Sequence, residues 1–241
     1  MAALSLLIHR ENSGSCPAGT DVAILYESSA PLPPSSPPIT WGGARNRASR
    51  VSASIGLLKA VELVEATRRA IAIGLPFNRH LTIHWAKAGL TNDQAAAATG
   101  RMLKLIRDWV RKRGGDVAHV WVRENGLGKG SHVHVLLHLP DGVTLGGMTR
   151  RWYKMVTGWR GRVTKGAVQT KCIGHSAQAA FSGSDWYEAN LAWLVAYLLN
   201  GVDPATANAL GLARQNEGGR IIGKRVAASE NLGRTFRKAR P

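Results

Sequence analysis

The sequence predicts an α+β fold of the ferredoxin-like βαββαβ order, in which an antiparallel sheet carries helices on one face. Three observations predict it. Segments that alternate between apolar and polar residues, as strands do, are interleaved with segments of helical period. Two successive strand-like segments are joined by a short glycine-rich loop, as in a hairpin. The chain has 241 residues, of which 44% are hydrophobic, and this is enough to bury a sizeable core.

A leading helix is expected over residues 55–73, because apolar residues recur there at helical spacing. Pro76 ends this helix, and residues 77–85 then alternate as a half-buried strand does. Thr91 has the chemistry of a helix N-cap, and Gly114 stops the helix that it begins. The elements expected next are strands over 117–123 and 132–139, a helix over 149–156, a strand over 168–173 and a helix over 186–200.

Composition divides the chain into three parts. Residues 1–50 are expected to be a disordered leader, since the run PLPPSSPP at 31–38 sustains neither a helix nor an inner strand. Residues 53–201 hold the regular elements and are expected to form the domain that carries the chemistry. Residues 202–241 are expected to be a basic C-terminal extension.

The charge balance predicts an anionic partner. Lys and Arg number 32 against 15 Asp and Glu, giving a net charge of +17. Nucleic acid is the leading partner class, and an anionic membrane surface is second. No apolar run is long enough to cross a bilayer, and no secretory signal is recognisable, so we expect a cytoplasmic protein without a membrane partner. Two distant cysteines, Cys16 and Cys172, exclude a disulfide framework and a thiolate zinc finger.

The segment SHVHVLLH at 131–138 carries the most specific chemistry. In a strand, His132 and His134 project from the same face, where two imidazoles can chelate one divalent ion. If the glycine-rich loop makes a hairpin, Glu124 lies opposite His132 or His134 and supplies a carboxylate. This mixed oxygen and nitrogen set suits Mg²⁺ or Mn²⁺.

Other histidines are assigned lesser roles. His138 shares the face of the pair but lies at the strand end, so it is expected either to support the ligands or to contact DNA. His80 and His84 share a face of the first strand with Thr82; a position near the site is one alternative, but we interpret them as ordinary surface histidines. His175 is expected in a loop without a role.

The helix over 186–200 contains Tyr197. A tyrosine in an apolar helix is by default a packing residue. The alternative is a nucleophile held over the metal face, which a metal-bound phosphate would make useful although a phenol has a pKa near 10.

Taken together, the His-Val-His segment, the acidic residue eight positions earlier and the tyrosine on a later helix resemble the HUH endonucleases, and more narrowly the rolling-circle replication initiators of plasmids and phages. The resemblance covers roughly residues 76–201. It implies an HUH-type palm in which Glu124, His132 and His134 bind Mg²⁺ or Mn²⁺. It also implies that Tyr197 nicks single-stranded origin DNA through a 5′-phosphotyrosine and later rejoins it. Host helicase and polymerase are the further partners implied.

One residue departs from the pattern of many initiators. They carry a lysine three residues after the tyrosine, where this chain has Asn200. Tyr153 and Tyr187 therefore remain as alternative nucleophiles. The residues expected to contact DNA are Arg123, Lys129, Arg150, Arg151, Lys154 and Asn200.

Other function classes are less consistent with the sequence. A histidine-triad nucleotide hydrolase would need a further histidine where Leu136 stands. A cupin-type metal site would need a glutamate a few residues after the histidine pair, where the chain is leucine-rich. The main alternative is a non-catalytic, basic nucleic-acid-binding protein, which would need no metal and cut no strand.

Overall fold

The computed structural model describes residues 50–176, 178–212 and 218–233. The expected leader therefore lies outside the described residues except for Arg50, as do residues 213–217 and the basic tail 234–241. Every helix and strand expected between residues 55 and 200 is present, with bounds that differ by a few residues. No helix in the described ranges has the length and apolar character needed to span a bilayer.

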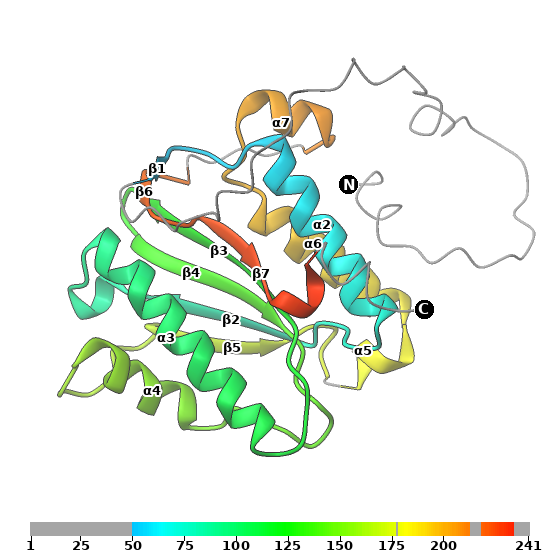
Figure 1. Ribbon diagram of the computed structural model, residues 1–241, viewed down its shortest axis with the longest axis horizontal. Coiled ribbons are helices and arrows are strands. Elements are labelled where there is room, and N and C mark those ends of the chain that lie inside the picture. Colours follow the sequence, from blue (N-terminus) through cyan, green and yellow to red (C-terminus); the bar gives the residue numbers. More distant parts are fainter. Residues whose placement is uncertain (1–49, 177, 213–217, 234–241) are drawn as a thin grey trace, which may run out of the picture. The chain divides into compact units, whose positions relative to one another are not determined.

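Five antiparallel strands form the main sheet (Figure 1). Their order across the sheet is β5-β2-β4-β3-β7, with β2 and β4 among the inner strands. The bounds are β2 (Arg79–His84), β3 (His119–Gly126), β4 (Gly130–Leu137), β5 (Val168–Cys172) and β7 (Val226–Ala228). A second, two-stranded sheet pairs β1 (Val51–Ser52) with β6 (Ile221–Ile222).

The α+β class is thus confirmed, and helices account for most of the remaining regular structure. They are α2 (Leu57–Ala72), α3 (Asn92–Arg111), α4 (Met148–Thr157), α5 (Ala179–Ser182), α6 (Asp185–Leu198) and α7 (Pro204–Ala209). Two short 3₁₀ turns, η2 (Ala86–Ala88) and η3 (Glu230–Leu232), complete the described elements. No pattern in the sequence predicted α5, α7, the 3₁₀ turns or the short strands β1, β6 and β7.

The helices α3 and α4 cover one face of the sheet. Leu81 and Ile83 of β2 and Val133 and Val135 of β4 alternate toward this face and are almost fully buried there. Met102 and Ile106 of α3 and Trp152 of α4 pack in the same cluster. The helix α3 begins at a capping box, in which the backbone N–H of Thr91 donates to Gln94 Oε1 at 2.9 Å.

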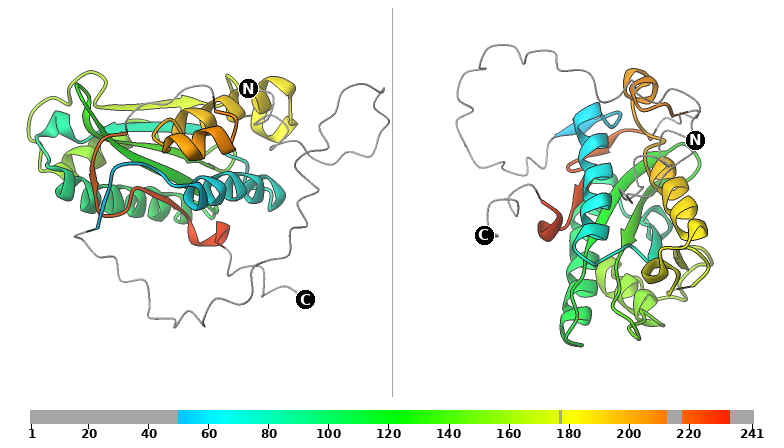
Figure 2. Two further views of the ribbon diagram at one scale, coloured as in Figure 1. Left: turned by 90° about the horizontal axis from the view of Figure 1, so that it is seen from above. Right: turned by 90° about the vertical axis from the view of Figure 1, so that its right-hand side faces the viewer.

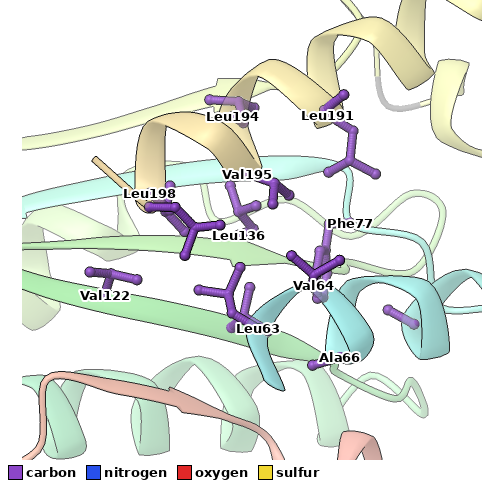
Figure 3. Close-up of a cluster of buried hydrophobic side chains, with 14 of the residues drawn as sticks. Leu63, Val64, Ala66, Phe77, Val122, Leu136, Leu191, Leu194, Val195 and Leu198 are labelled. Atoms are coloured by element: carbon purple, nitrogen blue, oxygen red, sulfur yellow. The ribbon is translucent and has the colours of Figure 1, made fainter. Parts of the chain in front are cut away.

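The helices α2 and α6 cover the opposite face, so the expectation of helices on one face was wrong. Leu136 of β4 and Val122 of β3 project to this side, where apolar residues of α2 and α6 pack on them (Figure 3). Figure 2 shows the strands between α3 and α6. The physical reason is that β4 is buried on both of its faces, with Val133 and Val135 on one and Leu136 on the other, so each face needs its own cover.

The expected boundary after residue 201 is not a boundary of the sheet, because β7 pairs with β3 along its outer edge. Arg225, next to β7, donates to the backbone oxygen of Ser52 at 2.7 Å and to its hydroxyl at 3.0 Å. Segments from the two ends of the described chain are thereby joined to each other and to the sheet.

Candidate metal centre

The register of three strands brings the candidate ligands together. His132 on β4 lies opposite Glu124 on β3 and opposite His84 on β2. Of the two pairings that the sequence left open for Glu124, the one with His132 is formed. Residues paired across an antiparallel ladder project to the same face, so Glu124 shares the face of the histidines. His134 follows two positions along the same strand and lies opposite Thr82.

His132 is oriented by the hairpin that precedes it. Its Nδ1 lies 2.8 Å from the carbonyl oxygen of Gly130, and since a carbonyl only accepts, Nδ1 carries the hydrogen. The lone pair is therefore on Nε2, which is buried and makes no hydrogen bond among the described residues. This nitrogen lies 3.3 Å from Oε2 of Glu124. A buried imidazole nitrogen with a free lone pair beside a carboxylate is what a metal ligand requires.

His134 is held by its neighbours on β2. Its Nδ1 lies 3.1 Å from the hydroxyl of Thr82 and 3.3 Å from Nε2 of His80. These contacts fix the ring on the strand, in the way that supporting hydrogen bonds fix ligand histidines in metalloproteins.

Glu124, His132 and His134 each offer a ligand atom, and these atoms lie within 4.8 Å of one another. The side chain of His132 is almost fully buried, whereas that of Glu124 keeps 18% of its surface exposed. Two imidazole nitrogens and one carboxylate oxygen can hold a divalent cation while leaving positions open for water or substrate. The trio is thus a cluster that could hold a metal ion.

Tyr197 lies beside this trio. The helix α6 carries it over the sheet, with the phenol hydroxyl 3.5 Å from Nε2 of His134 and the two rings edge to face at 5.0 Å. Trp193, one turn earlier, stacks on the phenol at 5.5 Å. Of the tyrosines in the described ranges, Tyr197 is the one whose hydroxyl approaches the trio.

The rival tyrosines are occupied elsewhere. Tyr153 is buried under the other face of the sheet, and its hydroxyl donates to the backbone oxygen of His84 at 3.0 Å. Tyr187 is buried on α6, and its hydroxyl donates to the backbone oxygen of Phe77 at 2.9 Å. Burial raises the pKa of Tyr153 to about 12 and raises that of Tyr187 as well. Neither phenol is available to a substrate at the trio.

The site keeps three of its imidazoles, those of His80, His84 and His134, neutral. Burial lowers the pKa of His134 well below 6.5, and the neighbouring histidines lower it further. Burial, followed by the charge of Lys171, lowers the pKa of His80 to about 4. The pKa of His84 also falls to about 4, first through burial and then through His132 and nearby lysines. Neutral imidazoles have free lone pairs at neutral pH, which metal binding requires.

The pKa of Tyr197 is raised rather than lowered. Burial raises the pKa of its phenol, and the negative charge of Glu124 raises it further. In the metal-free protein the phenol is therefore protonated at neutral pH.

A cavity of about 480 Å³ opens over the two histidines, between α6 and the strands β2, β4 and β5. His80, Thr82 and His84 form its floor together with His132 and His134. Lys171 on β5 and Lys129 in the hairpin turn bring positive charge to its lining. The volume falls within the range of ordinary ligand pockets, and Tyr197 lines it next to the trio.

Several predicted residues lie elsewhere. Arg123 is fully buried on the face opposite the histidines and donates to the carbonyl oxygens of Ile222 and Asn92. The expectation that it contacts DNA was therefore wrong. His138 is also buried, with Nδ1 2.8 Å from the carbonyl oxygen of Pro76, and it neither supports the trio nor reaches solvent.

The remaining DNA-contact candidates are on the surface or near Tyr197. Arg150, Arg151 and Lys154 are exposed on α4, which covers the face of the sheet away from the histidines. Lys129 is exposed in the turn between β3 and β4. Asn200 is half-buried directly after α6, and its backbone N–H donates to the carbonyl of Tyr197 at 3.2 Å.

Sequence reasoning missed part of the site. His80 and His84 were interpreted as surface residues, but they line the cavity beside the ligands. The alternation of β2 placed them on one face with Thr82, and only the pairing of β2 with β4, which no local pattern reveals, made that face the site. His175 was assigned no role, yet it lines the same cavity. No protein-family model, curated protein or solved structure matches this chain.

Proposed function

We propose that the protein is a metal-dependent nickase of single-stranded DNA, of the type that initiates rolling-circle replication. The observation that carries the proposal is the position of Tyr197, whose hydroxyl lies 3.5 Å from a member of the Glu124, His132 and His134 trio. A nucleophile beside a divalent-cation site, in a cavity with lysines on its lining, is the arrangement that phosphoryl transfer needs.

Different residues would bind the metal ion and attack the DNA. Glu124, His132 and His134 would hold Mg²⁺ or Mn²⁺, and that ion would polarise the scissile phosphate. Tyr197 would attack phosphorus through its phenol oxygen while the bond to the 3′-oxygen breaks, and the proton that the phenol loses would balance the one that the 3′-oxygen gains. The products would be a 5′-phosphotyrosine and a free 3′-hydroxyl, from which a host polymerase could extend after a helicase opens the duplex. Attack by a 3′-hydroxyl on the phosphotyrosine would rejoin the strand.

The fold supports this proposal at a coarser level. Strands β5, β2, β4 and β3 are adjacent and antiparallel, and α3 and α4 connect strands across one face. We propose that these elements form a ferredoxin-like palm of the HUH type, to which α2, α6 and β7 are added.

A single gel tests the activity. A pool of random-sequence single-stranded DNA labelled at the 3′ end is incubated with the protein and Mn²⁺ and then denatured. A 3′ label is needed because the proposed bond joins Tyr197 to the downstream fragment. We expect a labelled protein band that resists denaturation and disappears with EDTA and with Tyr197→Phe.

Tyr187→Phe is the matched control, because it removes a hydroxyl from the same helix without touching the trio. It should keep the adduct. A full-strength adduct with Tyr197→Phe would exclude Tyr197 as the nucleophile.

The alternative function is non-catalytic binding of nucleic acid, which the exposed indoles of Trp186 and Trp193 in the cavity lining favour. In that case the wild-type protein would bind the DNA pool tightly and with salt sensitivity, but it would form no adduct under any metal condition.

A further inference from the structure

Beyond the ligand trio, the cavity continues as a groove between α6 and the edge strand β5. We call this part the α6 groove and define it by Gln169, Lys171, His175, Trp186, Asn190 and Trp193. The α6 residues of the groove, at positions 186, 190 and 193, share one stripe of the helix, and this stripe continues to Tyr197. The groove therefore leads along α6 to the candidate nucleophile.

Two large aromatic side chains of the groove remain half exposed. Trp186 stacks on His175 with ring centroids 5.1 Å apart and planes at 6°, yet 58% of its surface is exposed. Trp193 stacks on Tyr197 with planes at 11° and keeps 50% of its surface exposed. Each indole thus has one ring neighbour from the protein and enough open surface to stack against a second ring.

The groove is held in shape before any ligand arrives. The backbone N–H of Gly174 donates to Asn190 Oδ1 at 3.2 Å, and this bond ties the loop after β5 to α6. His175 follows with a φ of 67°, an uncommon conformation for a residue other than glycine. Strained backbone of this kind is concentrated at functional sites. Here this backbone carries the imidazole of His175, which stacks on Trp186. The indole of Trp186 is therefore already held in place, and ligand binding loses less conformational entropy.

The charge of the groove selects an anionic ligand. Lys171 and Lys129 line the cavity, and no carboxylate is present among its described lining residues. A ligand that combines flat rings with negative charge at short intervals matches both properties, and single-stranded nucleic acid is such a ligand.

We propose that the α6 groove binds the single-stranded DNA next to the scissile phosphate, with one base stacked on Trp186, another on Trp193 and Lys171 on the backbone between them. This inference rests on the proposed function, of which it assigns the substrate path. The two indoles lie seven residues apart, or about 10.5 Å along the helix. That distance is about three steps of a strand stacked at about 3.4 Å, and fewer steps of a stretched strand.

Binding is measured with catalysis switched off. The probe is a fluorescein-labelled oligothymidine of about twenty nucleotides, longer than typical single-strand sites of about 4–16 nucleotides. It is titrated with the full chain carrying Tyr197→Phe in EDTA, and anisotropy is recorded. Adding Trp186→Ala or Trp193→Ala should weaken binding on the order of 10-fold to 100-fold. Lys171→Ala should weaken binding and reduce its salt dependence.

Trp159→Ala is the matched control, since Trp159 is a surface indole, 37% exposed, that does not line the cavity. It should bind the oligonucleotide as the parent does. An oligonucleotide of abasic residues provides the second control, because it keeps the phosphates and lacks the rings. Against this probe Trp186→Ala should bind as the parent does. Melting temperatures of all variants show whether the fold is kept.

The proposal is overturned if Trp186→Ala and Trp193→Ala bind oligothymidine like Trp159→Ala while remaining folded. It is also overturned if the abasic probe is bound equally well, or if oligouridine is preferred. These results are separable from the nicking assay, because the titration contains neither metal nor nucleophile. If the wild-type protein forms no covalent adduct but the α6 groove still binds the oligonucleotide, the proposed nickase activity is refuted and the proposed DNA-binding groove is retained.

Discussion

Gly130 connects the backbone of the β3–β4 hairpin to the candidate ligand His132. Its φ is +63°, and a Cβ added to it would lie 2.6 Å from the Cβ of Ala86. Its carbonyl oxygen also accepts the hydrogen bond from His132 Nδ1. Gly128, two residues earlier in the same turn, has a φ of +83° and open space around it. Alanine at these two positions therefore separates backbone strain from displacement of the ligand.

The expected magnitudes follow from these distances. A left-handed alanine costs about 1 to 2 kcal/mol, and this is the whole effect expected for Gly128→Ala. Gly130→Ala adds a contact about 1 Å shorter than the ordinary carbon separation of about 3.5 Å. Relieving such an overlap costs about 1 to 3 kcal/mol more. We expect Gly130→Ala to lower the free energy of unfolding by about 2 to 5 kcal/mol in total.

Relief of the overlap moves the carbonyl on which His132 depends. Loss of a supporting hydrogen bond typically reduces metal affinity by about 10-fold to 100-fold, and we expect a loss of this order for Gly130→Ala. Urea denaturation in EDTA measures the stability, and competition with a chromophoric chelator measures Mn²⁺ affinity. Gly128→Ala should bind Mn²⁺ as wild type does.

Equal stability of the two variants would refute the steric argument. Unchanged Mn²⁺ affinity in a destabilised Gly130→Ala variant would refute the role of the carbonyl in orienting His132.

Three further predictions concern the site and the core. Mn²⁺ at about 100 times its dissociation constant should stabilise the protein by about 2.7 kcal/mol, or about 5 to 11 °C in melting temperature, and Glu124→Gln should remove most of this shift in a thermal melt. An equal shift in both proteins would exclude Glu124 as a ligand. Arg123→Met should cost about 3 to 5 kcal/mol in urea denaturation because buried carbonyls lose a charged donor, whereas the exposed Arg150→Met should stay within about 0.5 kcal/mol; similar values would contradict the structural role of Arg123. Burial lowers the pKa of His119 to about 4, below its unfolded value of about 6.5. The stability that this neutral histidine contributes is therefore complete above about pH 6.5 and is lost as the pH falls toward 4. Denaturation at stepped pH should show that His119→Gln loses less stability over this window than wild type, and an identical loss would contradict the role of His119.

The sequence predicted the elements whose signals are local. The hairpin that places Glu124 against the histidine pair was predictable from its glycine-rich turn, although the turn did not decide between His132 and His134 as the residue opposite Glu124. Strand β7 was not predictable, because three residues are too few to show the alternation of apolar and polar residues that marks a strand. It is a strand because it pairs with the edge of β3. The second helical layer was missed because alternation does not show that both faces of β4 are buried.

For the site too, features set by local sequence were predictable and those set by tertiary pairing were not. His132 and His134 are two residues apart on one strand, so their common face needed no tertiary information. His84 reaches the site only through the pairing of β2 with β4, which joins residues that are far apart in the sequence. Arg123 has the charge of a DNA contact, but its position on the face opposite the histidines makes it a buried donor to backbone carbonyls. Charge by itself does not distinguish these roles.

The attachment of β7 to β3 has a consequence for synthesis of the protein. Val120 pairs with Ala228, and the two are 228 − 120 = 108 residues apart. At about 5 to 20 residues per second, a ribosome adds the intervening segment in roughly 5 to 20 seconds. During that interval the edge of β3 that later pairs with β7 is unpaired in the nascent chain, and a strand of another polypeptide could form hydrogen bonds with it. Chaperone demand during translation should therefore be greatest just before residues 226–228 emerge.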